Sequence, residues 1–145
     1  MGDHLTAPPL SPARGRALIK YVERLRDTLL LSHWTIILLE EHPQNGDAWA
    51  SIEPMTGRYL AKLRIGEGLF EEPPEKVRLV LVHEMFHVAR AKSLVTVLEG
   101  EFRAELGQTL YDQFAGAYKR EMEYEIDLTA EALARFFPLP PKWPR

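Results

Sequence analysis

The chain has 145 residues, of which 46% are hydrophobic and 27% are charged, so it can bury a core and has the usual size of one domain. Its 18 basic and 21 acidic residues give a net charge of -3 and form no basic stripe, which argues against nucleic acid as a partner. It has no cysteine, which excludes disulfides and thiolate metal sites, so a metal ion would have to be held by histidines and carboxylates.

Prolines are frequent near both ends of the chain, where they disfavour regular secondary structure. We therefore predict a loose leader over residues 1–10 and an extended tail over residues 138–145. No basic start is followed by an apolar run, and no apolar run reaches the length of a membrane span. These patterns predict a single domain over residues 1–145 that is soluble and cytoplasmic and has no membrane partner.

The first half of the chain is predicted to form one helix and three strands. Ser11 followed by Pro12 is typical of an N-cap and a first helical position, and apolar residues follow at helical spacing, which predicts a helix over about 12–30. Runs rich in β-branched, aromatic or alternating residues, separated by "PQNGD" and "MTG" turns, predict strands over residues 34–42, 48–54 and 58–66. In the third strand apolar and basic side chains alternate, so we expect a sheet that is covered on one face only.

The second half, from about Pro74, is predicted to be helical nearly to the tail. Gly100, Gly107 and Gly116 are the points at which this helical region is expected to break. The layout predicts an α+β fold: an N-terminal helix, a small three-stranded, mainly antiparallel sheet, and then C-terminal helices.

The predicted helix near Pro74 contains the motif "HEMFH" in its most apolar part. At helical spacing His83 and His87 lie on one face with Cβ atoms about 5 to 6 Å apart, so both imidazoles can bind one zinc ion. Glu84 lies about 100° round the helix, where it can reach a water molecule without binding the metal itself. In this arrangement zinc lowers the pKa of the water, and the glutamate accepts its proton as the water attacks a carbonyl carbon. The alternative, a chance motif in a core helix, would bury three ionisable groups at a high cost in free energy.

A catalytic zinc usually has three protein ligands, so a third is expected downstream. The acidic residues there are Glu121, Glu123, Glu125, Asp127 and Glu131. The expected apolar stripe of that helix consists of Tyr118, Met122, Ile126, Thr129, Leu133 and Phe136. Glu125 falls on one edge of the stripe and is the preferred third ligand. Glu123 borders the opposite edge and is the main rival, while Glu121 lies further round and Glu131 faces water.

Together, "HEMFH" and "EIDLTAEALARFFP" resemble the minimal gluzincin-like zincin metallopeptidases, which include small bacterial and phage zincins of the ImmA/IrrE type. In these proteins HExxH on one helix is completed by a glutamate on the next, within a segment written E-[AV]-[DN]-x-x-A. The resemblance implies that Glu125 is the third ligand and that Asp127 orients a ligand histidine. It also implies that an extended protein or peptide substrate pairs with residues 58–66 along the cleft edge; the alternative is an ordinary edge strand protected by its charges.

The other aromatic and histidine residues have simpler interpretations. Trp34 and Trp49 are expected to be core anchors of the sheet, and His33 and His42 to be surface residues. An oxyanion donor could be one of three tyrosines, each of which is more simply a core or rim residue: Tyr111, Tyr118 and Tyr124.

The sequence thus predicts a zinc metallopeptidase with one Zn²⁺ per chain, bound by His83, His87 and Glu125, and with Glu84 as the general base. Two alternatives stay open. One is a metal-binding or interaction protein with a zincin fold and no significant proteolysis, and the other is a helical scaffold in which the motif is incidental. A site of two histidines and one carboxylate also accepts manganese, nickel or iron.

Overall fold

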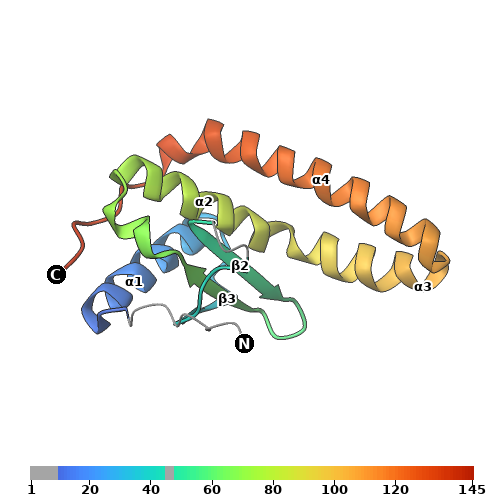
Figure 1. The fold of residues 1–145 in the computed structure, drawn as a ribbon, viewed down its shortest axis with the longest axis horizontal. Coiled ribbons are helices and arrows are strands. Elements are labelled where there is room, and N and C mark those ends of the chain that lie inside the picture. Colours follow the sequence, from blue (N-terminus) through green and yellow to red (C-terminus); the bar gives the residue numbers. More distant parts are fainter. Residues whose placement is uncertain (1–9, 45–47) are drawn as a thin grey trace, which may run out of the picture.

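The structure is a computed structural model that describes residues 10–44 and 48–145, so the predicted leader lies almost wholly outside the described residues. It confirms an α+β fold with a three-stranded sheet (Figure 1). The elements in chain order are α1 (Pro12–Thr28), β1 (Thr35–Leu39), β2 (Ala50–Met55), β3 (Leu60–Ile65), the 3₁₀ helix η1 (Glu67–Glu71), α2 (Pro74–Ala91), the π-helical η2 (Lys92–Phe102), α3 (Arg103–Glu105), α4 (Gln108–Leu133) and the 3₁₀ helix η3 (Ala134–Phe136). No helix in the described part of the chain is both long enough and apolar enough to cross a membrane.

Helix α1 begins where the sequence predicts. The hydroxyl of Ser11 accepts a hydrogen bond from the backbone N–H of Arg14 at 3.2 Å, and Pro12 occupies the first helical position. The helix ends at Thr28, close to the predicted boundary. Its buried face consists of Leu18, Tyr21, Val22 and Leu25. These side chains join the main core between the sheet and α2.

The sheet is mixed rather than mainly antiparallel, so this part of the prediction is wrong. The strand order is β1–β3–β2, with β3 antiparallel to β2 and parallel to β1. Strands β2 and β3 form a hairpin, whereas β1 and β2, which follow one another in the chain, lie at opposite edges of the sheet. As a result β3, which was expected at an edge, is the central strand, and β2 has a free edge within the described sheet.

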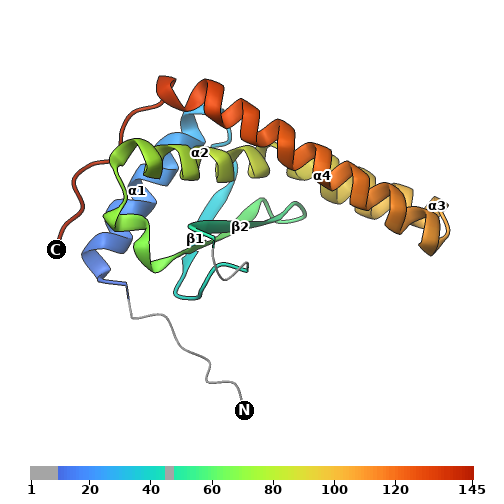
Figure 2. The same cartoon turned by 45° about the horizontal axis from the view of Figure 1, so that its top comes forward.

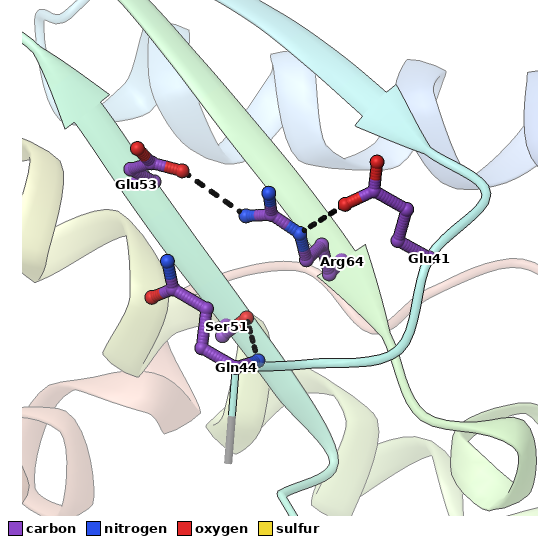
Figure 3. Close-up of polar contacts among 5 residues, drawn as sticks. All are labelled: Glu41, Gln44, Ser51, Glu53 and Arg64. Atoms are coloured by element: carbon purple, nitrogen blue, oxygen red, sulfur yellow. Dashed lines mark hydrogen bonds and ion pairs between the residues drawn. The ribbon is translucent and has the colours of Figure 1, made fainter. Parts of the chain in front are cut away.

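The helices cover one face of the sheet, as the alternation in β3 predicts (Figure 2). Ala61 and Leu63 point into the core and are fully buried. On the open face Arg64 lies between two glutamates, with Nε 2.9 Å from Oε2 of Glu41 and Nη1 3.2 Å from Oε2 of Glu53 (Figure 3). The open face is therefore charged, and the apolar core lies between the sheet and the helices.

The helices of the second half form a long antiparallel hairpin. Helices α2, η2 and α3 follow one another in one arm, and α4 returns beside them, so that the far end extends beyond the sheet (Figures 1 and 2). We call this feature, residues 74–133, the helical hairpin. The chain breaks at Gly107, one of the three predicted points, while Gly100 and Gly116 lie inside helices. A small second cluster of Leu98, Tyr111 and Ala115 holds the far end together.

The chain from Pro138 to Arg145 contains no helix or strand, as predicted for the tail. It packs along α1, where the Tyr21 hydroxyl donates to the carbonyl oxygen of Pro138 at 2.7 Å. The Arg14 guanidinium donates to the carbonyl oxygen of Pro144 at 2.8 Å. The tail thus ties α1 to the end of the helical hairpin.

Candidate metal centre

Helix α2 presents its two histidines on one side while its apolar face is buried in the core. The buried residues of α2 are Val77, Leu81, Val82, Met85, Val88 and Ala91. The His83 and His87 side chains are only 18% and 21% exposed, and their Nε2 atoms lie 3.1 Å apart. The spacing in "HEMFH" therefore brings two imidazole nitrogens to one point, as predicted.

Glu123 of α4 is the carboxylate that faces both histidines. Its Oε1 lies 2.9 Å from Nε2 of His83, and its Oε2 lies 3.0 Å from Nε2 of His87. One ligand atom from each of the three residues lies within 4.8 Å of the other two. Tetrahedral zinc with bonds of about 2.0 to 2.2 Å places its ligand atoms about 3.3 to 3.6 Å apart, so a small adjustment of these side chains would accommodate the ion.

Glu125, the third ligand expected from the sequence, does not face the histidines. Its Oε2 accepts a hydrogen bond from Nη1 of Arg90 at 2.9 Å, in an exposed ion pair between α2 and α4. Residues two apart lie about 160° from each other round a helix, so Glu123 and Glu125 cannot point the same way. The structure brings the rival carboxylate to the site instead of the preferred one.

The apolar stripe of α4 explains this difference. Ala130 belongs to the buried face, whereas Leu133 and Phe136 are 40% and 70% exposed, because α4 ends at Leu133 and a 3₁₀ turn follows. The apolar stripe predicted from the sequence was therefore centred too close to Glu125 on the helix surface. In addition, periodicity identifies the residues at both edges of a buried stripe but does not show which edge faces α2.

Asp127 lies on the other side of His83. Its Oδ1 is 2.9 Å from Nδ1 of His83, so a proton on Nδ1 can be donated to the carboxylate while Nε2 keeps a free lone pair for a metal. This contact agrees with the orienting role that the zincin resemblance implies. Glu123 and Asp127 are four residues apart and share a helix face, which is the signal that sequence reasoning missed.

Glu84 is a partly buried carboxyl group beside strand β2. Burial, and secondarily the nearby charge of Glu123, raise its pKa to about 8, while a backbone hydrogen bond from Ile52 acts in the opposite direction. Burial also lowers the pKa of His87, against the charge of Glu123. Near neutral pH and without a metal, the neutral forms of Glu84 and His87 are therefore favoured.

A pocket of about 490 Å³ opens over this cluster. Its lining comes from α2, from Glu123, and from β2 with the residues just before it. The three tyrosines considered as oxyanion donors are not among its lining residues: Tyr111, Tyr118 and Tyr124. His33 and His42 are exposed, as predicted.

The two tryptophans of the sheet region differ from each other. Trp34 is 4% exposed and belongs to the main core, as predicted. Trp49 is 38% exposed and borders the pocket, so its prediction as a core anchor is wrong. It precedes β2 at the rim of the sheet, where the side chain can stand beside the pocket.

Comparison of the chain with protein-family models, with curated proteins and with solved structures finds no match. The function can therefore be inferred only from the chemistry of the site itself. The site contains two histidines, two nearby carboxylates and a partly buried glutamic acid whose pKa is raised.

Proposed function

We propose that this chain is a zinc-dependent metallopeptidase in which His83, His87 and Glu123 hold the metal ion and Glu84 is the general base. The observation that carries the proposal is the convergence of two imidazole Nε2 atoms and one carboxylate within 4.8 Å. Nitrogen and carboxylate donors suit zinc, although manganese, nickel and iron accept the same set. Glu123 takes the place that the sequence-based prediction gave to Glu125.

A bound zinc ion would act as a Lewis acid that polarises the scissile carbonyl and lowers the pKa of a water molecule. Glu84 accepts the proton of the attacking water and delivers it to the leaving amine. Its raised pKa suits a group that has to take and release a proton near neutral pH. Asp127 keeps His83 in the orientation in which Nε2 faces the site.

Strand β2 is the element with which an extended substrate would pair, in place of residues 58–66. It is at the edge of the described sheet, and Ala50, Ser51 and Ile52 line the pocket. An unpaired strand edge offers backbone donors and acceptors to an extended peptide. Glu84 lies beside this edge, since the backbone of Ile52 is its hydrogen-bond partner. A peptide on β2 would therefore pass the general base.

Metal content tests the ligand set. In protein purified without chelator, elemental mass spectrometry is expected to find one zinc per chain in the wild type and none in His83→Ala or Glu123→Ala. Glu125→Ala is the matched control on the same helix and is expected to keep its zinc, because Glu125 pairs with Arg90. Loss of zinc in Glu125→Ala but not in Glu123→Ala would contradict the proposed ligand set.

Hydrolysis tests the role of Glu84. Glu84→Gln keeps the shape of the side chain but cannot accept a proton, so kcat on a peptide-library substrate is expected to fall about 10²- to 10⁴-fold with zinc content unchanged. Full activity in this variant would remove Glu84 from the mechanism.

A second candidate is a metal-binding interaction protein without proteolysis. It is favoured by the far end of the helical hairpin, where Val97, Phe102 and Phe114 are each more than 40% exposed. Apolar side chains grouped on a surface can mark a site of protein contact. Stoichiometric zinc with no hydrolysis of any peptide in the library would support this candidate, and absence of bound metal would leave the motif incidental.

A further inference from the structure

The pocket beside the histidines has two chemically different parts. One part carries the ionisable groups of the candidate metal centre, and the other is apolar. The apolar lining consists of Ala48, Trp49, Ala50, Ile52 and Val80. Val80 lies three residues before His83 on α2, so both parts belong to one continuous pocket.

The Trp49 ring is fixed by the backbone behind it. A Cβ atom on Gly68 would lie only 2.8 Å from Cζ3 of Trp49, so the absence of a side chain there lets the chain pack directly against the indole. At Gly66 a Cβ would lie 2.7 Å from the carbonyl oxygen of Ala48, and the Gly66 N–H donates to the carbonyl oxygen of Trp49 at 2.8 Å. The ring is thus held on one side while 38% of the residue stays exposed.

A second contact ties Gln44, which also lines the pocket, to strand β2. The backbone N–H of Gln44 donates to Oγ of Ser51 at 3.2 Å (Figure 3). Gln44 and Ser51 both line the pocket. Gln44 is therefore held at the pocket by β2, and Trp49 is held there by residues 66–68.

The distance from Trp49 to the general base suits one substrate side chain. Trp49 precedes Ile52, the backbone partner of Glu84, by three residues, which corresponds to about 10 Å along an extended chain. Adjacent Cα atoms of a substrate are about 3.8 Å apart. The side chain of a residue next to the scissile bond can therefore span the rest of the distance from that bond to Trp49. We propose that Trp49 and Val80 form a subsite for an apolar substrate side chain next to the bond that is cut.

This inference rests on the proposed peptidase function and specifies the substrate as a peptide with a leucine-like or aromatic residue at the cleavage site. An apolar subsite of this kind favours a substrate with a large apolar side chain over one that lacks the side chain by about 10- to 200-fold in kcat/KM. Trp49 is a specificity residue here, while the reaction itself is carried out by the groups around the histidines.

The test uses two zinc-binding probes, acetyl-leucine hydroxamate and acetyl-glycine hydroxamate, whose affinities are measured by calorimetry on zinc-loaded protein. Wild type is expected to bind the leucine probe at least about tenfold more tightly than the glycine probe. In Trp49→Ala this ratio is expected to fall below about threefold while glycine-probe binding stays unchanged. Trp49→Phe, which keeps an aromatic wall, is expected to retain most of the preference.

A second variant displaces the Trp49 ring without replacing Trp49 itself. Gly68→Ala places a Cβ too close to Trp49 and is expected to displace the indole and lower the same ratio. Gly57→Ala is the matched control, because a Cβ at Gly57 would meet no atom within 4 Å, and its ratio is expected to equal that of wild type.

The outcomes separate this inference from the proposed function, because zinc content is measured on the same samples. Equal ratios in zinc-loaded wild type and Trp49→Ala, or no leucine preference in wild type, would overturn the apolar subsite and leave the metal centre intact. A wild type that binds no zinc would overturn the peptidase proposal and this inference together.

Discussion

Two carboxylates one helical turn apart on α4 contact different nitrogens of the same histidine. Glu123 faces Nε2 of His83, where a metal would bind, and Asp127 faces Nδ1 on the opposite side of the ring. An imidazole held from both sides has one orientation, and a metal ion on Nε2 would leave the ring proton on Nδ1, facing Asp127. The geometry of the proposed centre is therefore expected to depend on Asp127, which is not among its proposed ligands.

We expect Asp127→Asn to weaken zinc binding about 10- to 100-fold, because a neutral amide supports the Nδ1 proton less well than a carboxylate. Competition with a chromogenic chelator measures this affinity. Glu121→Gln, an exposed carboxylate on the same helix, serves as the control. Equal zinc affinity in wild type and Asp127→Asn would show that the contact does not support the metal site.

Glu84 should make the stability of the metal-free protein depend on pH. Its folded-state pKa of about 8 lies above the ordinary value of 4.5, so its contribution to stability is complete below about pH 4.5 and is lost as the pH rises to about 8. His87 acts in the opposite direction, because its lowered pKa favours the neutral ring and its contribution is lost as the pH falls below 6.5.

The difference between wild type and Glu84→Gln isolates the effect of Glu84. With chelator present, the variant is expected to gain stability relative to wild type by up to about 1.4 kcal/mol per pH unit between pH 5 and 8. Urea unfolding at a series of pH values measures this difference. A difference that does not change with pH would mean that Glu84 titrates normally in the folded chain.

At the level of residues, the sequence predicts the part of the site that lies within one helix. His83, Glu84 and His87 are fixed relative to each other by helical spacing alone. The carboxylate proposed as the third ligand comes from another helix, and its identity depends on the side on which α4 packs against α2. That packing is a tertiary property, which is why Glu125 was preferred over Glu123.

Helix α1 ends in a motif that usually contains glycine. The N–H of Leu31 donates to the carbonyl oxygen of Arg26 at 3.0 Å, and the N–H of Leu30 donates to that of Asp27 at 3.0 Å, which is the Schellman pattern. Leu30 has φ 59°, in the left-handed region, and is 84% exposed. A leucine in this conformation costs about 1 to 2 kcal/mol, and its exposed side chain contributes little burial in return.

Leu30→Gly is therefore expected to stabilise the protein by about 0.5 to 1 kcal/mol after the added freedom of glycine in the unfolded chain is subtracted. The midpoint of urea unfolding should rise accordingly. Leu30→Ala keeps a Cβ in the same conformation and should leave the midpoint nearly unchanged. A lower midpoint for the glycine variant would contradict this account of the helix end.

At the level of elements, local patterns predict the helices and strands better than they predict the pairing of strands. The N-cap at Ser11 and the alternation in β3 are local, and both are found in the structure. The parallel pairing of β1 with β3 depends on which side of β3 each of the other two strands takes, which no local pattern specifies. The exposure of Trp49 was missed for a similar reason, because no local pattern shows that this residue precedes a strand at the edge of the sheet.

For the molecule as a whole, zinc is expected to connect the two arms of the helical hairpin and so to stabilise the fold. A ligand that binds only the folded state at 100 times its Kd adds about 2.7 kcal/mol, which raises Tm by about 5 to 10 °C in a chain of this size. Differential scanning calorimetry with zinc or with chelator measures the shift. His83→Ala should show almost no zinc-dependent shift, and a full shift in that variant would place the stabilising zinc elsewhere.

The helical hairpin also bears on how the chain length could change in evolution. The 35 residues between His87 and Glu123 include both arms of the hairpin beyond the proposed centre and the turn that joins them. Matched insertions or deletions in the two arms would lengthen or shorten this extension while leaving the register of His83, His87 and Glu123 unchanged. The interval between HExxH and the proposed third ligand could therefore vary among descendants of this chain, whereas the four-residue step from Glu123 to Asp127 could not.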